Sequence, residues 1–163
     1  MSGGAASFSL SLPLPPSVNH QYATVRGRRI LSAQGRRYKA TLAHMVSATL
    51  LHLPERRTLL QALQTHYLSL SLNLYLPSLL RPDIDAGLKI TQDAICEALS
   101  LNDNRIVEVH LYKRQDLQNP RMECVLAIVP SIPVPPPKRP LSHRRTSRLH
   151  APISQKLFPR LQE

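Results

Sequence analysis

The sequence predicts an α/β (α+β) fold in which a small mixed β-sheet is packed by two main helices. Over residues 67–76 every second residue is leucine, which is the period of a strand with one buried face. Residues 33–51 and 84–99 instead space their apolar side chains three and four apart, as amphipathic helices do. The 163 residues are 42% hydrophobic but only 4% aromatic, so we expect one domain with an aliphatic core.

The first strand is predicted at residues 8–14, where apolar side chains alternate with Ser and Pro. The pair Pro15-Pro16 ends this strand. Two short segments, 21–24 and 28–31, lie on either side of Gly27 and predict a β-hairpin.

A long helix is predicted at residues 33–51, with Ser32 as its N-terminal cap. Its buried stripe is expected to consist of Tyr38, Leu42, Met45, Val46, Leu50 and Leu53. Pro54 marks a boundary, and residues 55–66 form a connector to which we assign no secondary structure.

Three more elements follow the strand at 67–76. A helix at 84–99 is expected to direct Ile84, Leu88, Ile95 and Leu99 to the core, with Thr91 and Ala98 beside them. A strand at 106–114 carries Val107, Val109 and Leu111 on one face. Residues 123–129 are almost continuously apolar, which is typical of a central, buried strand.

The composition changes at Pro130. Residues 131–163 contain seven prolines and seven Lys or Arg residues against one acid, Glu163. Such a segment has little material for a core. We therefore predict one domain at 1–130, followed by a disordered, basic, Pro-rich C-terminal tail at 131–163.

The net charge of +11 indicates a polyanionic partner, which is nucleic acid or an acidic membrane surface. No apolar run is long enough to span a bilayer, and the N-terminus does not resemble a secretory signal. We therefore favour nucleic acid. Cys96 and Cys124 are too few for a disulfide framework, so we expect reduced core residues in a cytoplasmic protein.

Residues 81–89, RPDIDAGLK, contain the side chains that a metal-dependent phosphodiesterase needs. Asp83 and Asp85 flank one apolar residue, and Lys89 follows Asp85 by four positions. Asp103 arrives in the loop after the second helix. Carboxylate oxygens are the ligands that Mg²⁺ prefers, and a nearby cation can offset charge on a phosphate. The three aspartates are therefore predicted to hold Mg²⁺.

Each acid also has a structural explanation. Asp83 can cap a helix, and Asp85 suits the positive end of a helix dipole and can pair with Lys89. Asp103 lies in a sequence typical of a turn. A straight helix of about 15 residues is about 22 Å long. Asp103 thus meets Asp83 only if the loop folds back or if the second residue comes from another subunit, and the spacing leaves both arrangements open.

A cluster of basic residues without any acid precedes and opens the first main helix. It consists of Arg26, Arg28, Arg29, Arg36, Arg37 and Lys39. A solvated surface is the commoner role of such a run, but the net charge and the acidic motif favour contact with phosphates.

Together these motifs resemble the RusA family of Holliday junction resolvases. The matching residues are PPSVN (15–19), RGRRILSAQGRRY (26–38), RPDID (81–85) with Lys89 and Asp93, and Asp103 followed by IVE (106–108) and Lys113. They occur in the family's order, with compatible spacing, over roughly residues 8–129.

The resemblance implies a RusA-like homodimer of small α/β subunits with Mg²⁺ as cofactor. The implied function is a structure-selective endonuclease that resolves Holliday junctions by paired nicks in DNA recombination and repair. Its partners would be four-way DNA junctions and a second copy of the chain, with no membrane. The resemblance assigns Asp83, Asp85 and Asp103 to the metal and Lys89 to catalysis, and it implies that the acids converge. It also extends the expected DNA contacts to Asn19, Arg81 and Lys113.

The chain departs from the family at four positions. Ala86 stands where the family usually has Asn, and Asn102 where it often has a further Asp. Leu79 and Leu80 stand where a member can have basic residues. These departures motivate a second hypothesis, a non-catalytic binder of branched DNA on the same scaffold. A third is a general nucleic-acid-binding protein whose acids only cap helices.

Overall fold

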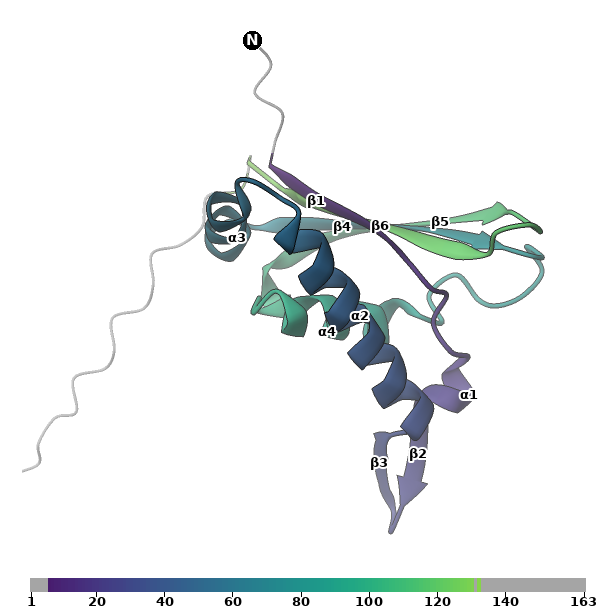
Figure 1. Cartoon of the computed structure of the whole chain (residues 1–163). Coiled ribbons are helices and arrows are strands. Elements are labelled where there is room, and N and C mark those ends of the chain that lie inside the picture. The colour runs from purple at the N-terminus through teal and green to yellow at the C-terminus, as the bar shows by residue number, and fades with distance from the viewer. Residues whose placement is uncertain (1–5, 131, 133–163) are drawn as a thin grey trace, which may run out of the picture.

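The computed structural model describes residues 6–130 and 132, which form a sheet covered by helices on one face (Figure 1). The strand order is β1-β6-β4-β5, with bounds β1 (Ser7–Leu12), β6 (Arg121–Ile128), β4 (Leu68–Leu76) and β5 (Ile106–Gln115). Strand β6 is antiparallel to β1 and β4, whereas β4 and β5 are parallel. The predicted mixed sheet is confirmed. The predicted tail at 131–163 lies outside the described residues, apart from Ile132.

Two main helices, α2 (Ala33–Leu51) and α4 (Leu88–Ala98), pack against each other and against the same face of the sheet (Figure 1). Helix α4 is the crossover that joins the parallel strands β4 and β5. Helix α2 has the predicted bounds, and its cap is confirmed because the Ser32 hydroxyl accepts a hydrogen bond from Gly35 N at 2.9 Å. No helix among the described residues is both long and apolar enough to cross a membrane.

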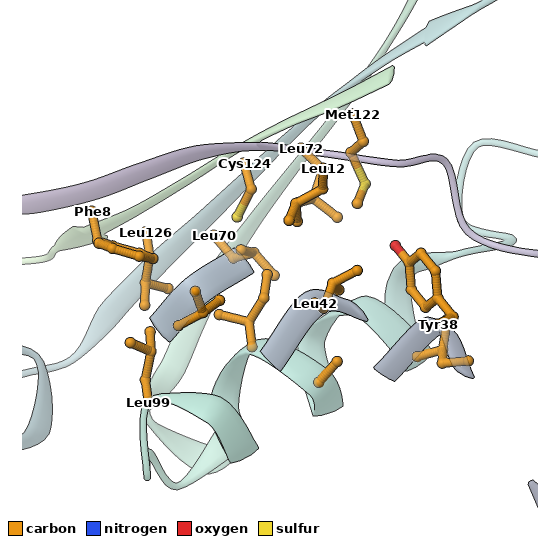
Figure 2. Packing of buried hydrophobic residues seen from close by; sticks show 14 of the residues in the cluster. Phe8, Leu12, Tyr38, Leu42, Leu70, Leu72, Leu99, Met122, Cys124 and Leu126 are labelled. Atoms are coloured by element: carbon orange, nitrogen blue, oxygen red, sulfur yellow. The ribbon is translucent and has the colours of Figure 1, made fainter. Parts of the chain in front are cut away.

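The core lies between the sheet and these two helices (Figure 2). The alternate leucines of β4 are buried, as their period predicts, and Leu70 and Leu72 face α2. The buried stripe of α2 contains Tyr38, Leu42 and Val46. Truncating one of these fully buried leucines to alanine is expected to cost about 2–5 kcal/mol of unfolding free energy.

Both cysteines are free and buried. Burial is the main cause that raises the pKa of the Cys96 thiol to about 11 and that of Cys124 to about 12. Both shifts disfavour the thiolate, which is the reactive form of a cysteine. The prediction of reduced core cysteines is confirmed.

Helix α4 begins four residues later than predicted. Residues 83–87 form two successive turns, in which Ala86 N donates to Asp83 O at 3.2 Å and Leu88 N donates to Asp85 O at 2.9 Å. The N-cap is Gly87, with no side-chain cap. The expectation that Ile84 faces the core is therefore wrong, since its side chain is 40% exposed.

The structure adds two findings about segments that the sequence left undefined or described only in part. The unassigned connector contains a helix, α3 (Arg56–Thr65), which buries Leu63 and half-buries Leu59 and Leu60. It lacks a capping signal, because the side chain of its N-cap, Glu55, makes no cap hydrogen bond. In β5, Val107 and Val109 are 43% and 41% exposed, since β5 is an edge strand that the helices do not fully cover.

The predicted hairpin is confirmed as β2 (Tyr22–Val25) and β3 (Arg28–Leu31), preceded by the single-turn helix α1 (Val18–Gln21). Arg26 and Gly27 form its two-residue loop, with φ values of 50° and 75°. Positive φ at both central residues is typical of a type I′ turn, which matches the twist of the two strands. The hairpin projects from the start of α2, away from the main sheet (Figure 1).

Candidate active site

The acidic loop, residues 77–87, joins the end of β4 to the start of α4. Asp83 and Asp85 are exposed on its two turns. Both carboxylates line one surface groove of about 410 Å³ together with Lys89. The hairpin contributes Tyr22 and Arg29 to the same groove. The fold therefore brings the acidic motif and part of the basic segment to one place, although about 50 residues separate them in the sequence.

The Gln21 side chain fixes this loop. It is only 3% exposed, and its amide nitrogen donates to Ala86 O and to Pro16 O, each at 2.8 Å. Ala86 directly follows Asp85, so one buried amide ties the acidic loop to the segment that enters α1. Gln21 O also accepts from Ser32 N at 2.9 Å, which connects this point to the start of α2.

Close backbone packing holds the same loop from the other side. A Cβ atom on Gly87 would lie 2.0 Å from Cγ of Pro15, a separation that no side chain can tolerate. Position 87 therefore requires glycine so that the loop can lie against Pro15. In the sequence, the only indication of this close packing was that Gly87 falls inside the predicted helix at 84–99. Nothing in the sequence indicated that Gln21 holds the acidic loop.

A second buried contact joins α2 to α4. The Tyr38 hydroxyl lies 3.1 Å from Thr91 Oγ1 and donates to Pro13 O at 3.4 Å. Burial is the main cause that raises the pKa of Tyr38 to about 12, so the phenol stays neutral. This contact joins the two main helices, and neither residue lines the groove.

Lys89 pairs with Asp93, at 3.1 Å, and not with Asp85. The hydrogen bond to Asp93 is the largest cause that raises the pKa of Lys89, and Asp103 adds a smaller electrostatic contribution. Lys89 therefore carries its charge throughout the neutral range. The expected Asp85–Lys89 pair is absent among the described residues, which leaves the Asp85 carboxylate open.

Asp103 lies in the short 3₁₀ helix η1 (Asp103–Arg105), just before β5. Asp103 lies just before the start of β5, and because β4 and β5 are parallel this is the end of the sheet at which both strands begin. The acidic loop instead follows the opposite end of β4. Within residues 6–130 and 132, no three His, Cys, Asp or Glu side chains form a group that could hold a metal ion. Two of the three predicted ligands thus share the groove, and Asp103 does not line it.

The three predicted ligands also have no partner. Among the described residues, the side chains of Asp83, Asp85 and Asp103 make no hydrogen bond and no ion pair. Four other described acids, Asp93, Glu97, Asp116 and Glu123, pair with Lys or Arg, and Glu108 lies 3.6 Å from His110. The unpaired carboxylates are available to an external cation.

The donor set in the groove fits Mg²⁺. This ion prefers oxygen ligands, keeps several waters, and is commonly held by one or two carboxylates together with substrate phosphates. Asp83 and Asp85 supply two exposed carboxylates, while Lys89 and Arg29 line the groove as cations that can face a phosphate.

The basic residues fall into two groups. Arg26 and Arg28 are exposed at the hairpin tip, and the Arg29 guanidinium lies 4.3 Å from the centroid of the Tyr22 ring in the groove. On α2, Arg37 is exposed with no partner among the described residues. Arg36 Nη1 donates to Leu31 O at 2.6 Å, and Lys39 pairs with Glu97 of α4, so both have structural contacts.

The remaining predicted DNA contacts lie around a second pocket, of about 650 Å³. Asn19, Arg81 and Asp83 line it. Lys113, half-buried on β5, pairs in register with Leu74, which also lines this pocket. Asp83 therefore stands between the groove and the pocket, since it lines both.

The two comparisons of this sequence with known proteins agree on one family. The chain matches the sequence model of the family described as "Endodeoxyribonuclease RusA" over residues 13–126. The crossover junction endodeoxyribonuclease RusA of Escherichia coli K12 is 26% identical over 121 residues, which cover 74% of this chain and 93% of that protein. The protein of the same name from Enterobacteria phage 82 gives the same values.

A solved structure is also similar, but weakly. The 2C-methyl-D-erythritol 2,4-cyclodiphosphate synthase of Plasmodium vivax is 14% identical, with a TM-score of 0.31, over 77% of this chain and 93% of that one. A score this low supports no statement about fold or function.

Proposed function

Since the chain belongs to the RusA family of endodeoxyribonucleases, we propose that it is a Mg²⁺-dependent endonuclease that resolves four-way DNA junctions by paired nicks, in recombination and repair. The observation that supports this proposal most is the groove in which Asp83, Asp85 and Lys89 meet Tyr22 and Arg29 of the basic hairpin. It combines unpaired acids for a metal with cations for a phosphate.

Each residue then has a defined role. Asp83 and Asp85 hold Mg²⁺, and the buried Gln21 amide keeps their loop in place. Bound magnesium would supply activation of water and stabilisation of charge on the phosphate. Arg29, held against the Tyr22 ring, contacts the phosphate backbone. Lys89 places a permanent positive charge beside the reacting phosphate, where it stabilises the transition state.

We assign Asp103 to the metal as well, in a two-fold homodimer. A dimer presents two grooves to two strands of a symmetric junction, which makes paired nicks geometrically simple. Asp103 does not line the groove, but it acts electrostatically on Lys89, which does. The candidate third ligand is therefore Asp103, either of the same subunit or of the second copy.

A second candidate function, binding of branched DNA without cleavage, is favoured by the Asn102 position. The Asn102 Oδ1 accepts a hydrogen bond from Asn104 N at 3.0 Å, so this side chain stabilises the turn and adds no charge to a metal site. Ala86 likewise contributes only its carbonyl, which accepts from Gln21.

A cleavage assay separates these functions. A synthetic four-way junction and a linear duplex of the same sequence are incubated with the protein in Mg²⁺ or in EDTA, each strand being labelled in turn. We expect paired nicks on opposed strands of the junction in Mg²⁺ alone. Junction binding without nicks would support the non-catalytic function, and equal binding to both DNAs would support the general nucleic-acid-binding protein.

A further inference from the structure

The second pocket of about 650 Å³ is not used by the proposed chemistry, although it shares Asp83 and Ala86 with the groove. Its floor is apolar, since Leu74 and Leu76 of β4 are almost fully buried there. Pro15, Pro16 and Pro77 form much of its wall. The pocket therefore adjoins the groove at Asp83, which lines both.

We propose that this pocket binds an unstacked nucleobase of the DNA strand whose phosphate lies in the groove. The inference rests on the proposed function, because it names the part of the substrate that the same site takes besides the phosphate. The pocket's volume is within the usual range of small-ligand sites, and apolar walls with a few polar groups at the edge are typical of pockets that take an extruded base.

Two polar side chains at the pocket can orient such a base. Asn19 is exposed and makes no side-chain hydrogen bond among the described residues. An asparagine amide offers both a donor and an acceptor, which suits the edge of a base. The exposed Arg81 guanidinium can contact the phosphate that follows the base.

Leu80 supports a nucleobase as the occupant. Leu80 is 93% exposed although it lines the pocket, so a partner that covers it would remove a large apolar surface from water. Arg81 at the same pocket is a cation that can face a phosphate, which favours nucleic acid over a purely apolar peptide as the occupant. An apolar side chain that covers a base stabilises the unstacked state.

This pocket also gives a physical reason for a preference for branched DNA. Extruding a base from an intact duplex costs the energy of stacking and pairing, and the cost is least for a base that is already unpaired. Bases at the centre of a junction are the least constrained in the molecule. A pocket beside the nicking site therefore favours branch points over linear duplex, even if the protein does not recognise the four-way geometry of the junction.

The chain contains a matched control for the test. Leu79 and Leu80 are adjacent exposed leucines, but Leu79, which is 45% exposed, does not line the pocket. We compare Leu80→Ala, Leu79→Ala and the unchanged protein, bound to junctions that carry 2-aminopurine at each nucleotide flanking the branch point. Ca²⁺ replaces Mg²⁺ to prevent nicking. We expect one position whose fluorescence rises on binding, a rise that Leu80→Ala abolishes and Leu79→Ala keeps.

A second measurement uses nicking in Mg²⁺. Replacing the responsive base by an abasic site should slow nicking by about tenfold, in line with the loss of one stacked base, and Leu80→Ala should slow it equally on the intact junction. Leu80→Ala acting on the junction with the abasic site should slow nicking no more than either change alone, because both remove the same contact.

Three outcomes would overturn the inference. They are the absence of a fluorescence rise at any position, equal effects of the two leucine variants, and a sedimentation shift in which Leu80→Ala dissociates a dimer. The last would make the pocket a protein interface. Failure of the proposed function is distinguishable, because it appears as no nicking by the unchanged protein while the fluorescence test in Ca²⁺ still gives its own answer.

Discussion

Two groups of charged residues lie near the end of β4, and they differ in whether their charges are paired. Around Arg121, at the start of β6, every charge is paired. Arg121 donates to Asp116 at 2.7 Å and to Glu123 at 2.9 Å, and its guanidinium lies 3.8 Å from the centroid of the Tyr75 ring. In the acidic loop that follows β4, Asp83 and Asp85 have no partner among the described residues.

From this difference we infer a separate role for each group. A protein with 21 Lys and Arg residues against 10 acids could pair every carboxylate it has. Asp83 and Asp85 are unpaired and only two residues apart, so they keep a local concentration of negative charge that an external cation can neutralise. The Arg121 group is therefore assigned to stability and the acidic loop to function, and the predictions below test this division.

The largest effect is expected from Asp85→Asn. The change removes a charged metal ligand but no internal contact, so the nicking rate should fall on the order of 10³-fold. The melting temperature should not fall, and junction affinity should persist or increase, since a negative charge near DNA is lost. Nicking of a labelled junction, junction binding in Ca²⁺ and thermal unfolding measure the three quantities. Asp83→Asn should behave in the same way.

Asp116→Asn is the matched control in the paired group. The hydrogen bond from Asn119 N is the largest cause that lowers the pKa of Asp116, followed by that from Arg121. A lowered folded-state pKa contributes stability above the unfolded value of about 3.9, and this stability is lost as the pH falls further. Asp116→Asn should thus lower the melting temperature at pH 7 but less at pH 3, with nicking unchanged. A nicking loss as large as that of Asp85→Asn would break the comparison.

The next effect concerns Lys89, which is paired yet lines the groove. Lys89→Ala should slow nicking of a bound junction by about 10²-fold while changing affinity much less, because its charge acts mainly in the transition state. Asp93→Asn removes the main cause of the raised pKa of Lys89. The alkaline limit of the nicking rate should then move to lower pH. Equal losses of affinity and rate in Lys89→Ala would make Lys89 a binding residue.

A smaller effect is expected from Gln21→Ala, which releases the acidic loop without touching a carboxylate. The Mg²⁺ concentration for half-maximal nicking should rise by about tenfold, as is typical when a group that orients metal ligands is lost. Excess Mg²⁺ should restore most of the rate. The matched control is Tyr38→Phe, which removes the buried contact to Thr91. Each of the two substitutions should lower the free energy of unfolding by about 1–3 kcal/mol, because each removes a buried hydrogen-bonding group. Tyr38→Phe should nevertheless leave the Mg²⁺ dependence of nicking unchanged.

These tests address what could and could not be predicted from the sequence. The strand β4 and the helix α2 were predicted almost to the residue, since leucine at period two and the Ser32 cap are local signals. The start of α4 was predicted too early. The pattern from Ile84 onward is helical, but packing of Gly87 on Pro15 and the Gln21 bond to Ala86 hold that segment in turns. Those contacts join segments about 65 residues apart, and no local pattern contains them.

The acidic residues divide in the same way. Their chemistry was predicted from residue type, and the groove brings together Asp83, Asp85 and Lys89. The position of Asp103 was left open, because helix length alone separates it from Asp83. The parallel direction of β4 and β5 shows that Asp103 precedes the start of β5 whereas the acidic loop follows the end of β4. Strand direction is a property of the whole sheet, which residue spacing does not contain.

The smallest effect is expected from removing the basic tail. Residues 131–163 carry seven Lys and Arg against one acid, and every residue of the core cluster lies between Phe8 and Leu126. We predict that a chain ending at Pro130 folds and keeps its Mg²⁺ requirement and its junction preference, but binds all DNA less tightly. Each phosphate contact that is lost should make the log–log salt dependence of binding shallower by roughly 0.9 on duplex DNA.

Binding of the full-length and the truncated protein to linear and four-way DNA across a salt series measures this change. The Arg37→Ala variant, which removes one exposed cation from the folded domain, provides the scale for a single contact. An unchanged slope would mean that the tail does not touch phosphates. A truncated chain that unfolds or loses its junction preference would instead place the tail within the domain.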